Sequence, residues 1–323
     1  MNSKLSELIT LGLAVCFLAP AARAADPPIT SVALAPDGKS VVACSQAGSR
    51  VYSWPELKPR KKLETTAANL HHVAFSPEGK RLAVGGGMPA EEGTVEIFSW
   101  PDGRPLRALD DHHDCVMDVA WLGKSTLTSA SLDHSIMVWD TETGSPAQRL
   151  EGHSRGVSSL CFVAQKRLLV SSGLDRSLRV WSLDRSELIH SLDHHTLPVH
   201  DIALRPGAPG LPMLASVSDD RTVRLWQPTI GRRVRFVRLS SRPLDVDWLP
   251  DGSTVVVACA DGHVRRIDPV EVKVTEDIPA VDGWAYSLAV HPADGSIVVG
   301  GRDGQIRRVV TGPAKDSADA NGR

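Results

Sequence analysis

The sequence has few of the residues and motifs that mark common enzyme and membrane-protein classes. Its 323 residues include five cysteines, two tyrosines and five phenylalanines. No G-x-S-x-G elbow, glycine-rich phosphate loop or H-E-x-x-H motif is present. The net charge of −2 gives no electrostatic reason to expect a nucleic acid or an acidic membrane as partner. These absences predict a chain that is not an enzyme and carries no cofactor.

Long apolar runs are also missing. The run from Leu8 to Leu18 is too short to cross a bilayer as a helix, which argues against a membrane anchor. It follows Lys4 and precedes Ala22-Arg23-Ala24, and this arrangement is typical of a secretory signal peptide with an A-x-A cleavage site. We therefore expect residues 1–24 to be a signal peptide. The protein would be exported, periplasmic or secreted, and would have no membrane insertion after cleavage.

What the sequence does contain is an internal repeat. In residues 129–140, 171–182 and 216–227, a Ser stands ten residues and an Asp six residues before a Trp. The same position recurs seven times at intervals of 41 to 46 residues, filled by Tyr52, Phe98, Trp139, Trp181, Trp226, Ile267 and Val309. Repeats of this length indicate stacked structural units.

Each unit contains short β-branched and aromatic runs separated by turn residues. In the fourth unit we expect strands from Val157 to Phe162, Leu168 to Ser171, Leu178 to Trp181 and Leu188 to Leu192. Pro-Asp-Gly corners such as Pro36-Asp37-Gly38 predict hairpins, because Pro presets one turn angle and Gly accepts a positive φ. The pattern is all-β.

With Trp139-Asp140 as its eponymous pair, the chain resembles the WD-repeat (WD40) family. The resemblance implies a seven-bladed β-propeller of four-stranded antiparallel blades over residues 25–312, followed by a flexible tail at 313–323. It also implies three buried hydrogen-bonded tetrads, made by His112, Ser129, Asp133 and Trp139; His153, Ser171, Asp175 and Trp181; and His195, Ser216, Asp220 and Trp226.

The other four units lack this set. They have Cys44, Met88 or a valine in the Ser position and no matching His, so we expect blades one, two, six and seven to be less rigidly tied. Only residues 25–28, with two prolines, precede the first strand. Because proline cannot donate to a ladder, blade seven is expected to have three strands or to be completed by the tail.

We interpret the cysteines and the two histidine pairs as structural residues. Cys44, Cys115, Cys161 and Cys259 fall at positions of the propeller that we expect to be too distant for disulfides, and we predict free, mostly buried thiols. The His112-His113 and His194-His195 pairs suggest a metal, but His112 and His195 belong to tetrads, so we predict no metal. The basic tract 232–238 alternates like an outer strand, with a nucleic-acid patch as the less favoured reading.

The resemblance implies a non-catalytic scaffold, a monomer on its own, that binds a protein or peptide on the top face around the channel. The alternative is a propeller enzyme or ligand receptor that uses the channel mouth. The predicted partner-binding residues are Trp284, Tyr286, Arg242, Arg302, His71, His200, Met117, Asp219 and Glu91. Trp284 could instead plug the channel or pack locally.

Overall fold

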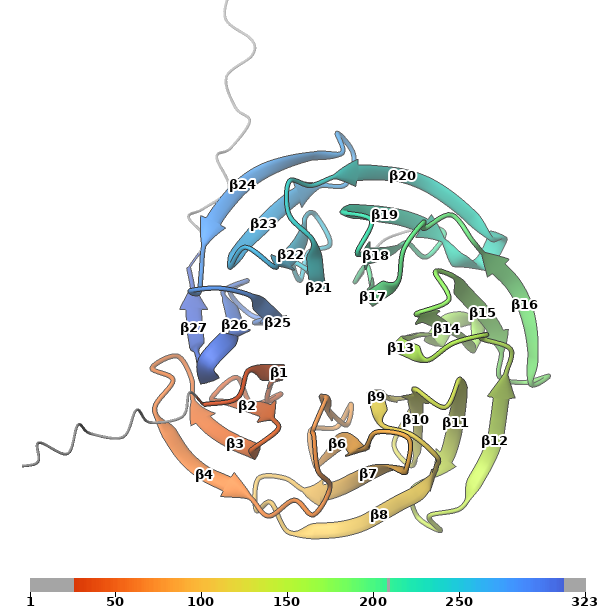
Figure 1. Ribbon diagram of the computed structural model, residues 1–323, viewed down its shortest axis with the longest axis vertical. Coiled ribbons are helices and arrows are strands. Elements are labelled where there is room, and N and C mark those ends of the chain that lie inside the picture. Colours follow the sequence, from red (N-terminus) through yellow and green to blue (C-terminus); the bar gives the residue numbers. More distant parts are fainter. Residues whose placement is uncertain (1–25, 208–209, 311–323) are drawn as a thin grey trace, which may run out of the picture.

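The computed structural model describes residues 26–207 and 210–310, which form seven antiparallel sheets arranged as a ring (Figure 1). The predicted seven-bladed β-propeller is confirmed. Six sheets have four strands, and the described part of the seventh has three. The predicted signal peptide and the tail at 313–323 lie outside the described residues.

Seven inner strands surround the central channel (Figure 1). They are β1 (Ile29–Leu34), β5 (His72–Phe75), β9 (Val116–Trp121), β13 (Val157–Val163), β17 (Val199–Leu204), β21 (Pro243–Trp248) and β25 (Ala285–Val290). The second strands are β2 (Ser40–Ser45), β6 (Arg81–Met88), β10 (Thr126–Ser131), β14 (Leu168–Gly173), β18 (Leu214–Ser218), β22 (Val255–Cys259) and β26 (Ile297–Gly301).

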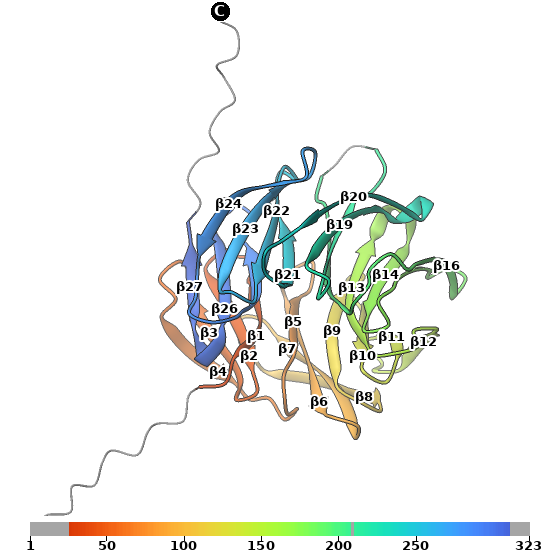
Figure 2. The same ribbon diagram turned by 45° about the horizontal axis from the view of Figure 1, so that its top comes forward.

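The third and fourth strands complete the blades toward the rim (Figure 2). The third strands are β3 (Gly48–Ser53), β7 (Glu92–Ser99), β11 (Ser135–Asp140), β15 (Leu178–Ser182), β19 (Thr222–Gln227), β23 (His263–Asp268) and β27 (Ile306–Val309). The outer strands are β4 (Pro59–Leu63), β8 (Pro105–His112), β12 (Pro146–Glu151), β16 (Glu187–Leu192), β20 (Arg232–Arg238) and β24 (Lys273–Pro279). Three short 3₁₀ turns connect strands, η1 (Ala164–Lys166), η2 (Pro228–Ile230) and η3 (Arg302–Gly304).

The hairpin corners have the predicted chemistry. At Pro36-Asp37-Gly38, the Gly38 N–H donates to the Ala35 carbonyl at 2.9 Å, and Gly38 has a φ of +64°. A residue with a Cβ is strained in this left-handed region. The expected strands of the fourth unit correspond to β13 to β16, and the basic tract is the outer strand β20.

The hydrophobic core lies between neighbouring blades rather than within one. Second- and third-strand side chains of one blade pack against inner-strand side chains of the next, as Val217 and Leu225 of blade five do against Val246 and Trp248 of blade six. The same arrangement closes the ring, since Val298 of blade seven packs against Ile29, Val32 and other residues of blade one. Each blade is therefore stabilised by two neighbours.

Candidate functional site: the blade tetrads and the channel mouth

The three predicted tetrads are each joined by continuous hydrogen bonds. In blade three, the His112 Nδ1 lies 2.8 Å from Asp133, and its Nε2 lies 2.7 Å from the Ser129 Oγ. The Trp139 indole N–H donates to the same Ser129 Oγ at 2.8 Å. Blades four and five repeat this geometry, with distances of 2.7 to 3.0 Å, in His153, Ser171, Asp175, Trp181 and in His195, Ser216, Asp220, Trp226.

In each tetrad the imidazole Nδ1–H can donate to the carboxylate, while the Ser hydroxyl accepts from the Trp indole and can donate to Nε2. Burial raises the pKa of Asp133, but hydrogen bonds from His112 and Ser135 outweigh it and hold that pKa well below its usual range. Burial lowers the pKa of His195, against the opposing effect of Asp220. The Asp side chains are thus acceptors inside the fold and are not available as general acids.

The strand register corrects the assignment of two Ser positions. In blade three, Ser129 lies two residues after Leu127, the partner of Trp139. The same count places Ala43 opposite Arg50 in blade one, because Val41 pairs with Tyr52. In blade two the same count gives Val84. The predictions of Cys44 and Met88 were wrong. Cys44 lies one residue beyond this position in blade one, and Met88 lies four residues beyond it in the longer hairpin of blade two.

Blade six ties its turn by a different pair. Arg265 donates to the turn residue Asp261 at 2.7 and 3.0 Å and also to Asp277. We expected blades without a tetrad to be less rigidly held, but this expectation did not take account of the ion pair in blade six. The sequence signal was present, since Arg265 stands four residues after Asp261, as Arg224 stands four after Asp220.

Carboxylates connect the inner strands around the channel. Asp118 of blade three accepts the Leu160 N–H of blade four at 2.6 Å, and Asp245 of blade six accepts the Leu288 N–H of blade seven at 2.7 Å. Asp201 of blade five accepts the Val246 N–H of blade six at 3.0 Å. Our sequence interpretation missed this ring, although each Asp directly precedes the inner-strand aliphatic residue of its unit.

These carboxylates face a channel cavity of about 600 Å³. Burial and the neighbouring Asp201 raise the pKa of Asp245 well above its usual range. Burial also raises the pKa of Asp247 to about 6. The channel wall is therefore less negative than its four aspartates suggest.

At the mouth of the channel, Trp284 is held in a chain of contacts. The Arg242 guanidinium lies 4.7 Å from the centre of the Trp284 ring. The centres of the Trp284 and Tyr286 rings are 5.6 Å apart. Arg242 pairs with Asp219 at 3.7 Å, and His200 contacts the same Asp219 oxygen at 2.9 Å. We name Trp284, Arg242, Asp219 and His200 the mouth cluster. It brings residues of blades five, six and seven together.

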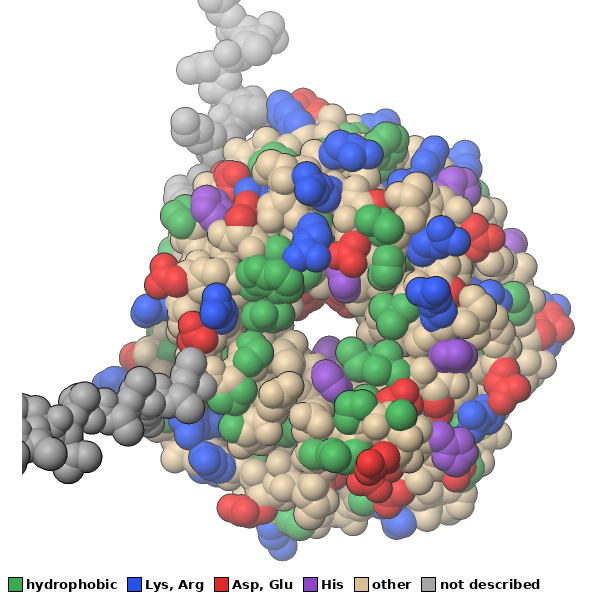
Figure 3. Space-filling view, viewed as in Figure 1, with side chains coloured by type: hydrophobic (Ala, Val, Ile, Leu, Met, Phe, Trp, Pro, Cys, Tyr) green, Lys and Arg blue, Asp and Glu red, His purple; other side chains and the backbone are tan. Residues whose placement is uncertain are grey.

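Trp284 is 38% exposed and lines the channel cavity without filling it. Figure 3 shows hydrophobic side chains around the channel mouth, with basic and acidic side chains beside them. Tyr286, Met117, His71 and His200 line the same cavity. Trp284 therefore packs against its neighbours and still leaves part of its ring accessible at the channel mouth.

Two predicted residues are placed apart from the mouth cluster. The Arg302 N–H donates to the Trp284 carbonyl at 3.1 Å, but its exposed side chain contacts Asp303. Glu91 is exposed in the turn of the long β6–β7 hairpin of blade two. Both are therefore peripheral to the mouth cluster.

Cys44, Cys115, Cys161 and Cys259 are free and buried, as predicted. Burial raises the pKa of Cys161 to about 12 and that of Cys259 to about 11, which makes both thiols poor nucleophiles. Within 26–207 and 210–310, no group of three or more His, Cys, Asp or Glu side chains could hold a metal ion. No helix of these ranges is long and apolar enough to cross a membrane.

The ring of antiparallel blades defines a seven-bladed propeller, and the tetrads define its class. The family model "WD domain, G-beta repeat" matches residues 103–140, 144–182, 186–227 and 239–268. These segments cover much of blades three to six. The four matched segments are WD40 repeats, and they lie within a ring of seven blades.

Several curated proteins are similar in sequence to part of this chain. It is similar to "Nuclear distribution protein PAC1" of Ajellomyces capsulatus, with 36% identity over 54% of this chain and 38% of the relative. "Protein FIZZY-RELATED 2" of Arabidopsis thaliana has 27% identity over 84% of this chain and 57% of its own length. "U3 small nucleolar RNA-associated protein 15 homolog" of Gallus gallus has 26% identity over 73% and 45%. The chain spans about half the length of these relatives, or less.

Proposed function

We propose that this propeller is a non-catalytic scaffold that binds a protein or peptide partner at the channel mouth. The observation that carries the proposal is the mouth cluster, in which a half-exposed tryptophan is fixed by an arginine whose own position is set by Asp219. Aromatic and arginine side chains of this kind dominate binding energy at protein interfaces, and a rigid side chain loses little entropy on binding. None of the three relatives' names denotes an enzyme.

The test compares two exposed aromatic side chains. Trp284 lies at the mouth, whereas Phe236, 48% exposed, lies on the outer strand β20. Partners are identified by cross-linking in the native host and mass spectrometry, and their affinity is then measured with purified proteins. We expect Trp284→Ala to weaken the partner at least tenfold, the loss typical of a hot spot, and Phe236→Ala to leave it unchanged. Equal affinity of the Trp284→Ala and wild-type proteins for the partner would contradict the proposal.

A ligand receptor at the same mouth is the second candidate. The channel cavity of about 600 Å³ is within the usual range of ligand pockets, about 300–1,000 Å³. The Asp201 and Asp245 oxygens already accept hydrogen bonds from the strands, which favours binding over acid-base catalysis. A small molecule that co-purifies, and is lost in a Tyr286→Ala protein, would favour this candidate over the scaffold.

We further propose that the chain is exported, that it is a monomer in the absence of its partner, and that it does not bind nucleic acid. The support for export is the sequence of residues 1–24. N-terminal sequencing of the mature protein is expected to begin at Ala25, and a mature chain that begins at Met1 would contradict export. Light scattering would check the monomer.

A further inference from the structure

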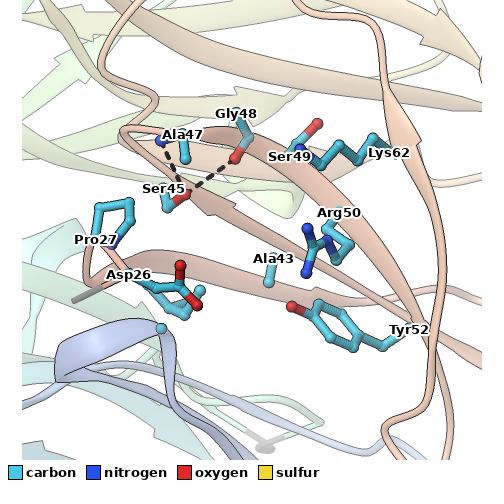
Figure 4. Close-up of a pocket in the computed structure, with 12 residues that line it drawn as sticks. Asp26, Pro27, Ala43, Ser45, Ala47, Gly48, Ser49, Arg50, Tyr52 and Lys62 are labelled. Atoms are coloured by element: carbon cyan, nitrogen blue, oxygen red, sulfur yellow. Dashed lines mark hydrogen bonds between the residues drawn. The ribbon is translucent and has the colours of Figure 1, made fainter. Parts of the chain in front are cut away.

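A second cavity, of about 90 Å³, lies where blade one meets blade seven, and it shares no lining residue with the channel. Figure 4 shows the polar ends of Asp26, Arg50 and Tyr52 turned toward one space. A single water needs about 10–15 Å³ of such space, so the cavity has room for a molecule of several heavy atoms.

This cavity occupies the place that the tetrad fills in blades three to five. Tyr52 stands in the Trp position and Ala43 in the Ser position, and both line the cavity. Ala43 has no hydroxyl for an imidazole, and the segment before β1 supplies Asp26 rather than a His. The space therefore stays open in blade one.

Arg50, the arginine in this cavity, lacks the carboxylate partner that the corresponding arginine has in other blades. The residue two before the Trp position is an arginine in blades four, five and six, and each contacts the carboxylate of its own turn: Arg179–Asp175 at 3.8 Å, Arg224–Asp220 at 3.3 Å and Arg265–Asp261 at 2.7 Å. Arg50 stands at this position in blade one, but its turn residue is Gln46. Within the described part of the chain, Arg50 has no ion pair within 4.0 Å.

Blade seven has a pocket of about 200 Å³ at the corresponding place, lined by Asp282, Gln305 and Arg307. There the Gln305 side chain exchanges hydrogen bonds with the Asp282 backbone, at 3.1 Å in each direction. Arg307, the corresponding arginine, is exposed, as is Arg50. Blade one has no such side chain over its cavity, and Ser49, 2% exposed, leaves a hydroxyl without a partner among the described residues.

Asp26 places a negative charge across the cavity from Arg50. Its position depends on Gly304 of blade seven, where a Cβ would lie only 2.8 Å from the Asp26 Cβ. Asp26 has no ion-pair partner in the described ranges. The cavity thus presents a guanidinium and a carboxylate that are not paired with each other, together with the Tyr52 hydroxyl and the Lys62 side chain.

We propose that this cavity binds a small zwitterion of the α-amino acid class, with the ligand carboxylate on Arg50 and the ligand ammonium group on Asp26. The carboxylate replaces the turn carboxylate that the arginine contacts in blades four to six. A ligand with one charge leaves either Arg50 or Asp26 uncompensated. The site lies apart from the mouth cluster, so it does not depend on the proposed scaffold function.

The test is a calorimetric titration of the full chain with glycine, and with acetate and methylammonium as single-charge probes. We expect glycine to bind saturably and roughly tenfold more tightly than either single-charge probe, since each lost charge-assisted hydrogen bond weakens binding by about this factor. Arg50→Met should weaken glycine by a similar factor. Methionine is compatible with the fold, because Met137 occupies this position in blade three.

Two further variants separate the site from general charge attraction. Gln46→Asp keeps every cation but gives Arg50 a turn carboxylate, so it should abolish glycine binding. Asp26→Asn should reverse the preference, with acetate then tighter than glycine. Arg60→Met removes an exposed arginine of the same blade and serves as the control with unchanged binding. The proposal is overturned if glycine does not bind saturably, or if Arg50→Met and Arg60→Met have the same affinity.

Discussion

Blades three to five hold their turns with a buried imidazole, whereas blade six uses an arginine. The turn carboxylate is 4–7% exposed in the tetrad blades and 37% exposed in blade six. A buried carboxylate requires all its hydrogen bonds, because water cannot replace a lost partner. The half-exposed carboxylate of blade six can be hydrated. The turn carboxylate can therefore be held by a histidine where it is buried and by an arginine where it is partly exposed.

The largest difference between the two kinds of blade should come from the Trp position. Trp226 is fully buried and donates to Ser216, so Trp226→Ala should lower the free energy of unfolding by about 3–5 kcal/mol. Val309 holds this position in blade seven, and Val309→Ala removes only two methyl groups, about 1–2 kcal/mol. Urea unfolding followed by circular dichroism measures both. Equal losses would show that the indole adds nothing to its blade.

A second comparison removes the partner of each turn carboxylate. His153→Leu leaves Asp175 and Ser171 with fewer partners in a buried place, and we expect a loss of about 1–3 kcal/mol. Arg265→Met should lose less than about 1 kcal/mol, because Asp261 and Asp277 are partly exposed. The same urea experiment gives both values. A larger loss for Arg265→Met would reverse the proposed ranking of the blades.

The smallest expected effect is the dependence of stability on pH that the tetrad histidine His195 contributes. Burial holds the pKa of His195 below its ordinary value of 6.5, so the unfolded chain binds the proton first as pH falls. The stability that His195 contributes is therefore present above pH 6.5 and decreases below it. The carboxylates Asp133, Asp175 and Asp220 add a loss with the same sign below pH 3.8.

Thermal unfolding from pH 7.5 to pH 5 isolates the histidine effect, because the difference between wild type and His195→Gln should shrink as pH falls. His113→Gln is the control, since His113 is exposed beside a tetrad. A difference that grows toward acid would contradict the neutral imidazole. Asp247 acts in the opposite sense in all of these proteins, because its pKa is raised to about 6, and it cancels in the comparison.

The repeat in the sequence was sufficient for the architecture, because the Ser, Asp and Trp spacing is set by hairpins of nearly constant length. The same reasoning failed where the hairpin length varied: Met88 stands ten residues before Phe98, as Ser129 does before Trp139, but the register moves the position to Val84. In blade one it moves the position from Cys44 to Ala43. The channel carboxylates could have been found, since Asp118, Asp201 and Asp245 share one position in their units. The raised pKa of Asp245 could not, because it depends on burial and on Asp201 of the neighbouring blade.

By itself the sequence determined the number of blades, their strands and the members of the tetrads, all of which depend on contacts within one repeat. Only the tertiary structure decided what the blades make together: the mouth cluster that joins Trp284 to Arg242 and Asp219, and the cavity between Asp26 and Arg50. The physical reason is closure of the ring. It brings together side chains from separate repeats, whose distances no spacing within a repeat can specify.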